Sequence, residues 1–272
     1  MDVTDNKLKE IKNHWQSWAT EYGEDLRATT RSSNIKELEI KVLIESISSV
    51  LASNKNILEV GCGNGYNAIS ISKKLKHKVD GFDFIPDMIE SANLNLEQLN
   101  KEDKERLSFF VGDVLDINTE KKYDLIYSCR CLINLPNTEL QDEAIKEILG
   151  MLDVGGYFFM LENFNDNYSS QNNIRDLVGL DKRIPAEFNH FFDSSHVYSL
   201  VDSLGATVVD VKNFASLHDI VQYIVVPMLN DGVVRYDHDV INAVTKLLMS
   251  VDTNTGCNFG DYGQNKLVII KK

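Results

Sequence analysis

Apolar residues recur along the chain with two different spacings. Near the N-terminus they return every three or four positions over residues 5–22 and 34–52, which predicts two helices joined by a polar segment. Further on, short apolar runs typical of buried strands alternate with helical patterns. We expect strands at 56–60, 78–83, 107–111, 123–128, 155–162, 206–213 and 265–271, and helices at 64–75, 86–100, 138–151 and 194–203. Such alternation builds right-handed crossovers, and therefore predicts an α/β fold with a parallel sheet flanked by helices.

The same patterns divide the chain into four segments. Residues 1–54 form the expected N-terminal helical arm, and residues 55–215 carry the strand-helix alternation of the core. Residues 216–250 interrupt this alternation with mixed, partly helical sequence. We expect them to cap the carboxyl edge of the sheet, and residues 251–272 to return to it as the last strand of the core.

Composition restricts the partners of the protein. The formal net charge is −13, whereas a protein that binds nucleic acid normally shows a basic field, so we expect no nucleic-acid partner. The longest apolar runs are too short to span a membrane, and the N-terminal sequence lacks the apolar stretch of a signal peptide. The four cysteines are irregularly spaced. They are expected as reduced thiols of a cytoplasmic protein, without a metal site.

A glycine-rich turn, "EVGCGNG", follows the first expected strand. Gly61, Gly63 and Gly65 permit backbone conformations that other residues avoid, and they let a ligand approach the main chain. The NAD fingerprint needs Gly-x-Gly-x-x-Gly, but Tyr66 stands in place of its third glycine. Glu59 would repel a pyrophosphate, and it suits an ammonium group or the amides of the turn.

Two further acidic residues end neighbouring strands. Asp83 ends the second strand and can accept hydrogen bonds from both hydroxyls of a ribose. Asp113 follows the third strand and can accept from an adenine amino group. With Glu59 they would hold the ammonium, ribose and adenine parts of one ligand, in the order found in S-adenosylmethionine. An NAD-dependent oxidoreductase is the alternative, because a ribose acid alone also suits NAD.

These segments resemble the motifs of class I, seven-stranded S-adenosylmethionine-dependent methyltransferases. The family's Glu/Asp-x-Gly-x-Gly-x-Gly matches "EVGCGNG", its ribose acid matches Asp83 in "GFDFIPDMIESA", and its adenine acid matches Asp113 in "VGDV". Its fourth-strand and fifth-strand segments match "YDLIYSCRCLINL" and "LDVGGYFFMLE", although Asp153-Val154 replaces the usual Lys/Arg-Pro. The resemblance is strongest over residues 55–165. It implies a Rossmann-like, mostly parallel sheet with strand order 3-2-1-4-5-7-6, an antiparallel seventh strand and helices on both faces.

The resemblance also implies candidate site residues. For the cofactor these are Glu59, Gly61, Cys62, Gly63, Gly65, Asp83, Phe84, Met88, Asp113, Val114, Cys129 and, from the arm, Tyr22. For the methyl acceptor they are Trp18, Arg27, Arg130, Asn163 and Asn189. The candidate catalytic residues are His190 as a general base, Glu162 as a base or positioning group, and Arg130 beside the expected methyl group. Each of these three also has a structural interpretation, as a packed loop histidine, a buried strand-end carboxylate or a salt bridge.

Methyl transfer needs an in-line nucleophile and protection from water. An oxygen acceptor usually also needs a base to remove its proton, whereas a neutral amine needs only desolvation and positioning. We therefore expect an S-adenosylmethionine-dependent methyltransferase acting on O or N of a small metabolite or sugar derivative. An anionic acceptor from a surface-polysaccharide or secondary-metabolite pathway is one form of this expectation. The alternatives are a protein or peptide methyltransferase and a noncatalytic S-adenosylmethionine-binding partner subunit.

Methylation of nucleic-acid amino groups is not expected. Such enzymes carry Asp/Asn-Pro-Pro-Tyr/Phe after the fourth strand, where this chain reads "CRCL". The acidic net charge agrees with this exclusion. The sequence leaves the oligomeric state open between a monomer and a homodimer.

Overall fold

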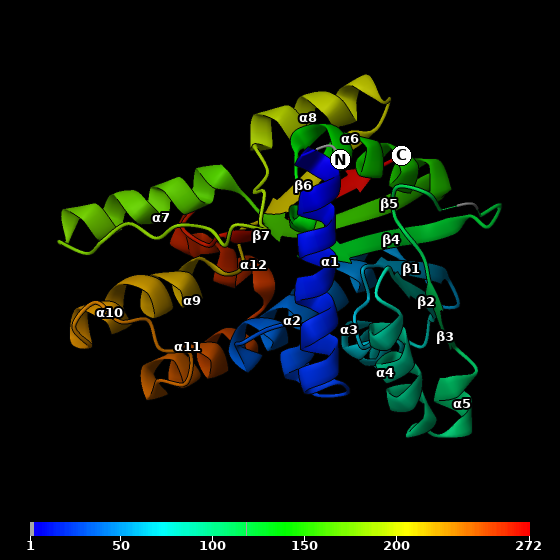
Figure 1. Cartoon of the computed structure of the whole chain (residues 1–272), viewed down its shortest axis with the longest axis horizontal. Helices are drawn as coiled ribbons and strands as arrows, with labels where there is room; N and C mark the ends of the chain where they lie inside the picture. The colour runs from blue at the N-terminus through cyan, green and yellow to red at the C-terminus, as the bar shows by residue number, and fades with distance from the viewer. Residues whose placement is uncertain (1–2, 118) are drawn as a thin grey trace.

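A seven-stranded sheet forms the centre of the protein in the computed structural model, which describes residues 3–117 and 119–272 (Figure 1). Its strands are β1 (Asn56–Val60), β2 (Lys78–Asp83), β3 (Leu107–Val111), β4 (Tyr123–Cys129), β5 (Leu152–Asn163), β6 (Thr207–Lys212) and β7 (Asn265–Lys271). Their order is β3-β2-β1-β4-β5-β7-β6, and β7 runs antiparallel to both of its neighbours. The predicted Rossmann-like topology is confirmed.

Helices cover both faces of the sheet. They are α1 (Val3–Tyr22), α2 (Ser33–Val50), α3 (Tyr66–Leu75), α4 (Pro86–Glu97), α5 (Lys101–Lys104), α6 (Thr138–Met151), α7 (Asn165–Leu177), α8 (Ser194–Ser203), α9 (Ser216–Ile220), α10 (Val226–Leu229), α11 (Asp239–Ser250) and α12 (Thr253–Gly256). Three short 3-10 turns, η1 (Leu26–Ala28), η2 (Leu132–Asn134) and η4 (Cys257–Phe259), and a π-helical turn, η3 (Val221–Val225), join them.

Adjacent residues of β5 show how the sheet separates two apolar cores. Phe158 packs into a core shared with α6 and α8, where Ile148 and Val197 lie. Phe159 points to the other face and packs with Ile47 of α2. Successive side chains of a strand alternate between faces, so one strand contributes to both cores. Because both faces are covered, the central strands read as nearly continuous apolar runs.

Helix α7 shows where apolar periodicity fails as a signal, because the sequence patterns predicted no helix there. Its inward face is polar, with Asn167, Gln171 and Arg175 all buried. Their side chains donate to the backbone carbonyls of Gly263, Tyr262 and Tyr223. Hydrogen bonds to the chain's own backbone therefore anchor this helix together with one buried ring, that of Tyr168.

Two segments lie at the carboxyl edge of the parallel strands. Helix α1 crosses this edge in front of the sheet (Figure 1), where Gln16 bonds to Asp87 at the start of α4 and Lys7 Nζ donates to the carbonyl of Pro136 over 3.3 Å. The first two residues of the predicted arm lie outside the described residues. The insertion between β6 and β7 contains α9, η3, α10 and α11, and α11 packs against α2. Among the described residues, no helix combines the length and apolarity needed to cross a bilayer.

Candidate functional site

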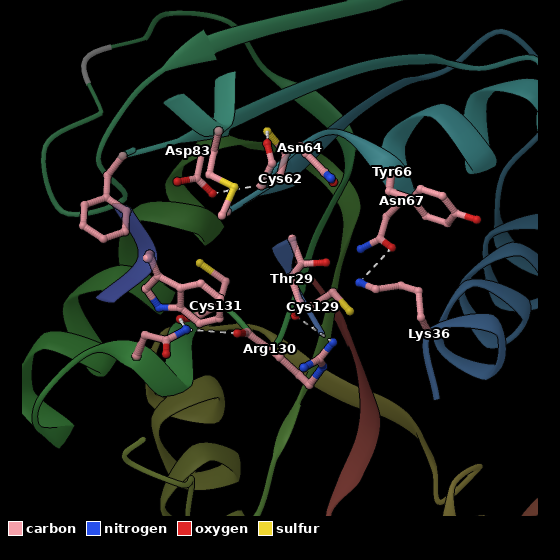
Figure 2. Close-up of a pocket in the computed structure, with 16 residues that line it drawn as sticks. Thr29, Lys36, Cys62, Asn64, Tyr66, Asn67, Asp83, Cys129, Arg130 and Cys131 are labelled. Atoms are coloured by element: carbon pink, nitrogen blue, oxygen red, sulfur yellow. Dashed lines mark hydrogen bonds between the residues drawn. The ribbon is translucent and has the colours of Figure 1, made fainter. Parts of the chain in front are cut away.

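Three adjoining cavities lie at the carboxyl ends of the parallel strands. We call them the loop cavity, of about 80 Å³ beside the glycine turn (Figure 2), the strand-end cavity, of about 290 Å³ between β2, β3 and α1, and the arm cavity, of about 450 Å³ between α1, α7 and the insertion. The loop and strand-end cavities share Gly61, Asp83, Phe84, Cys131 and Asn134. The loop and arm cavities share Trp15, Thr29, Arg130 and Asn134.

The glycine turn is packed tightly against two other segments. Gly61 has φ +68°, and a Cβ there would lie 2.2 Å from Cys131 Sγ. Gly63 has φ +51°, and a Cβ there would lie 2.5 Å from Thr29 Cγ2 of the arm. Side chains at these positions would therefore push the turn away from the loop after β4 and from the arm. Both glycines line the loop cavity, and Gly61 also lines the strand-end cavity.

Asp83 stands at the junction of the loop and strand-end cavities. Its two carboxylate oxygens accept from the amides of Gly63 and Ile85, each over 2.9 Å. Burial raises the pKa of this carboxyl to about 6, in spite of those two bonds. Each oxygen keeps a further lone pair, so the carboxylate can still accept from hydroxyl groups of a ligand in either cavity.

The strand-end cavity is mostly apolar, with Asp83 at its junction with the loop cavity and Asp113 further along its wall. Val60, Phe82 and Leu135 contribute apolar surface, and α1 closes the cavity with Ile11. Asp113 lines the same cavity, and its Oδ1 accepts from the amide of Leu115 over 3.0 Å. An apolar slot with an acceptor group beyond Asp83 fits a flat heterocycle that carries an amino group.

Lys36 is a wall residue of the loop cavity that the sequence patterns did not single out. Its side chain is only 3% exposed, and Nζ donates to Asn67 Oδ1 over 3.2 Å (Figure 2). The nearest carboxylate, Glu39 Oε2, lies 3.7 Å away. A buried ammonium on the wall fits the carboxylate of an amino-acid ligand. The sequence did contain one signal for a buried cation. Glu39 lies four positions after Ile35, on the apolar face of α2, and a buried carboxylate there needs a positive partner.

Two of the candidate cofactor residues lie behind the cavities. Glu59 turns towards the start of α3, where its carboxylate accepts from Asn67 Nδ2 over 2.9 Å and from the amide of Ala68 over 3.1 Å. Burial raises its pKa to about 7. Gly65 begins α3 with φ +77°, and a Cβ there would lie 2.8 Å from Phe109 Cζ. In this structure Glu59 therefore supports the turn from behind, and Gly65 packs against β3.

Arg130 lines the loop and arm cavities, but a carboxylate of the protein already binds it. Its Nε donates to Glu39 Oε1 over 2.7 Å, and Glu39 is fully buried. Asn265 Nδ2 also donates to Glu39, over 2.8 Å. Burial opposes the charge of Glu39, but Arg130 and then Lys36 hold its pKa below the usual range. Arg130 therefore links β4 to α2, and its charge is not free for an anionic acceptor.

The two other candidate catalytic residues also bond within the protein. Glu162 accepts from the amides of Cys131, Leu132 and Ile133 over 3.1–3.3 Å, and it lines none of the three cavities. Burial raises its pKa to about 7. His190 Nε2 lies 3.0 Å from Thr138 Oγ1, also away from the cavities. Glu162 therefore stabilises the loop after β4 and His190 contacts the start of α6, so the geometry does not support their predicted catalytic roles.

The candidate acceptor residues separate into two groups. Trp18 and Asn189 line the arm cavity. Arg27 lies outside it and forms an exposed two-point ion pair with Asp25. Asn163 ends β5 in a buried position away from the three cavities. Tyr22, a cofactor candidate, packs beside Trp18 with a ring separation of 5.4 Å and also lies outside the cavities.

The remaining cofactor candidates line the cavities. Gly61, Cys62, Gly63, Asp83, Phe84, Met88 and Cys129 line the loop cavity, and Asp113 and Val114 line the strand-end cavity. An ammonium, an acid at each of two strand ends and an apolar slot follow one another along this edge. They fit the carboxylate, ribose and adenine parts of S-adenosylmethionine.

The chain was compared with known protein families and structures. Residues 57–156 match the family described as "Methyltransferase domain". This stretch begins in β1, ends in β5 and contains the glycine turn, Asp83 and Asp113. Residues 57–156 form a methyltransferase domain. The match removes the NAD-dependent alternative that the ribose acid alone left open.

Relatives and solved structures agree on this domain and its fold. Over 104 residues the chain is 39% identical to malonyl-[acyl-carrier protein] O-methyltransferase 1 of Ilyobacter polytropus, a match that spans 37% of this chain and 35% of that protein. A Haloferax volcanii methyltransferase, solved in complex with the Trm112 methyltransferase activator, has a similar fold with a TM-score of 0.60 at 16% identity, over 94% of this chain and 96% of that one. Magnesium protoporphyrin IX methyltransferase of Synechocystis PCC 6803, solved with bound SAH, follows with a TM-score of 0.56 at 12% identity, over 88% and 84% of the two chains. At these identities the solved structures show the fold alone.

Proposed function

We propose that the methyltransferase domain transfers a methyl group from S-adenosylmethionine to a nitrogen or oxygen of a small molecule held in the arm cavity. The observation that supports this is the junction of the cavities. Trp15, Thr29 and Arg130 line both the loop cavity, where the cofactor's amino-acid end fits, and the larger arm cavity. A molecule in the arm cavity would therefore face the part of the cofactor that carries the methyl group.

The residues of the chain supply binding, orientation and exclusion of water. When bound, S-adenosylmethionine supplies an electrophilic methyl group on a sulfonium. Asp83 would hold the ribose hydroxyls, Asp113 the adenine amino group and Lys36 the carboxylate. Helix α1 covers the strand-end cavity with Ile11 and borders the arm cavity with Trp15, so it shields both from solvent. Shielding and alignment are the contributions that a displacement of this kind needs most.

His14 becomes the candidate base for a hydroxyl acceptor. It is the one histidine among the described residues that line the arm cavity, and its ring stacks on Phe188 at 4.3 Å. Burial, followed by the charge of Arg31, lowers its pKa. The imidazole is therefore neutral at physiological pH and can accept a proton. A neutral amine acceptor would need only the positioning.

Binding and turnover test the proposal directly. Calorimetry with S-adenosylhomocysteine should show a single site, and Asp83→Asn should weaken it. Asp80→Asn is the matched control, because Asp80 lies on the same strand but bonds to Lys121 and Tyr123 instead. Release of S-adenosylhomocysteine over a panel of small amines, phenols and acids should then identify an acceptor. An intact protein that binds no S-adenosylhomocysteine would exclude the proposal.

The Ilyobacter relative supports a second acceptor class. Its name refers to an acid carried by a protein, and small acids are already among the acceptors to be screened. Malonyl carrier protein therefore belongs in the panel, together with a peptide mixture. Cofactor binding without turnover on any of these acceptors would favour a noncatalytic, partner-stabilising subunit.

A further inference from the structure

The arm cavity contains arginines that no carboxylate of the protein neutralises. Arg31 and Arg183 both line it, and among the described residues neither forms an ion pair with Asp or Glu, in contrast to Arg130. Arg183 instead donates to the side-chain oxygens of Gln171 and Gln264. Unpaired guanidinium groups are unexpected in a chain of net charge −13, where carboxylates outnumber cations. They mark a region that suits an anion from outside the protein.

A third guanidinium strengthens the positive character of the same wall. Arg175 is buried, and its side chain donates to the backbone carbonyls of Asp181 and Tyr223. Burial and then the charge of Arg183 lower the pKa of Arg175. Among the described residues, Asp219 is the one acid that lines the arm cavity. It already accepts from the amide of Gln264 over 2.9 Å and lies 2.9 Å from His218 Nδ1. Asp219 therefore does not neutralise the arginines.

Aromatic rings line the same cavity on both sides. On one wall, the guanidinium of Arg183 lies 3.4 Å from the ring centre of Tyr223 and 5.1 Å from that of Tyr168. On the other, Arg31 lies 5.5 Å from the ring centre of Trp18. Stacking holds each guanidinium flat, which leaves its edge N–H groups for a planar or tetrahedral anion. Ring faces between the two walls favour a flat, apolar body for the molecule that carries the anion.

We propose that the arm cavity selects acceptors that combine an aromatic ring with an anionic group, a carboxylate or a phosphate, bound by Arg183 and Arg31. This inference rests on the proposed function, because it names the substrate class of the same site. It also moves the predicted anion site from Arg130, which Glu39 neutralises, to two other arginines of the same cavity. The anionic group serves recognition here, and the methyl group goes to a separate nitrogen or oxygen of the acceptor.

The protein's own fluorescence can test this proposal. Its two tryptophans, Trp15 and Trp18, both line the arm cavity, so tryptophan emission reports occupancy without a label. We would titrate the full chain, with and without S-adenosylhomocysteine, with 4-hydroxyphenylacetate, phenyl phosphate and tyramine. Saturable quenching by one or both anions, and none by the cationic tyramine, supports the proposal. Comparison of the two anionic probes shows whether the site prefers a carboxylate or a phosphate.

Variants with matched controls then assign the effect to the arginines. Arg183→Met and Arg31→Met should each weaken binding of the anionic probe by about tenfold, while S-adenosylhomocysteine binding by calorimetry stays unchanged. The controls are Lys182→Met, an exposed neighbour of Arg183, and Arg27→Met, which removes a cation of the arm that lies outside the cavity. Because the two arginines lie on different walls, Arg31→Met still tests the proposal if Arg183→Met fails to fold by circular dichroism.

Two results would overturn the inference. One is tyramine binding as tightly as the anions, and the other is anion binding that neither arginine variant weakens. If S-adenosylhomocysteine still binds in those cases, the proposed function stands and only the acceptor class is lost. Anion-selective quenching in a protein that binds no S-adenosylhomocysteine would have the opposite meaning, since it supports the anion site and removes the methyl transfer.

Discussion

The two ends of the site are built from the sequence in different ways. The cofactor end draws mainly on one continuous stretch, from the glycine turn after β1 to Asp113 after β3, in which the glycine turn, Asp83 and Asp113 each lie at or just after the end of a parallel strand. The arm cavity combines side chains from α1, the segment after η1, the loop after α7, the insertion and the start of β7. Sequence order therefore gives the geometry of the first end, but the geometry of the second depends on how distant segments pack.

One buried ion pair couples these two ends, and removing it should have the largest effect. Glu39→Ala leaves Arg130 and Lys36 without their shared carboxylate in the interior. Breaking a buried pair from one side costs about 3–5 kcal/mol, which we expect as a loss in the free energy of unfolding measured with urea. The control is Glu37→Ala, because Glu37 lies on the same helix α2 but is exposed. A loss below about 1 kcal/mol would show that water already reaches the pair.

Buried carboxyls at the cofactor end should make stability fall as the pH rises towards neutrality. Burial raises the pKa of Glu59 and Glu162 to about 7 each and that of Asp83 to about 6. An acid with a raised folded-state pKa binds more protons when folded, so its contribution is fully present below the unfolded pKa and is lost as the pH rises through the folded one.

The expected outcome is a melting temperature that decreases between about pH 5 and pH 7.5. For Glu162, whose pKa rises from 4.5 to about 7, the loss in the free energy of unfolding is on the order of 3 kcal/mol. Glu162→Gln resembles the protonated form and should flatten this decrease. A melting temperature that rises steadily over the interval would show that these carboxyls are ionised in the folded protein.

At the cofactor end alone, Asp83→Asn should reduce affinity for S-adenosylhomocysteine about 30- to 100-fold. The amide keeps one acceptor oxygen but loses the charge and places an NH2 group against the amide of Gly63 or of Ile85, where the carboxylate now accepts. Charge-assisted hydrogen bonds are worth about 1.5–3 kcal/mol each. Calorimetry measures the change, and an affinity within threefold of the unaltered protein would remove Asp83 from the site.

The contrast between the two ends also explains what sequence reasoning could and could not reach. The strand ends at Asp83 and near Asp113 were predictable because strands 78–83 and 107–111 are short apolar runs followed by turns. The direction of Glu162 was not, since a residue at a strand end can face the cleft or the loop behind it, and only the loop's three amides decide between them. Arg183 gave no signal at all, because a polar loop shows no periodicity that would place it against Tyr223.

Lys36→Met tests whether the arm contributes to cofactor binding from the side that sequence patterns overlooked. Methionine keeps the length and apolar stem of the side chain but removes the ammonium, so the glycine turn should stay in place. We expect about a tenfold loss of affinity for S-adenosylhomocysteine and little change for adenosine, which lacks the carboxylate. Equal losses for both ligands would indicate a disturbed cavity instead of a lost ion pair.

Arg27→Ala should have the smallest effect and so sharpens the distinction between arm residues. The ion pair of Arg27 with Asp25 is exposed, with 63% and 42% of the two side chains accessible, and exposed ion pairs contribute little to stability. Asp25 also accepts from the amide of Arg27, and this bond survives the substitution. The urea midpoint of unfolding should therefore equal that of the unaltered protein within error, and ligand affinities should not change. A marked loss of acceptor binding would instead mean that the arm closes further in the complex, which would bring Arg27 to the cavity beside Arg31.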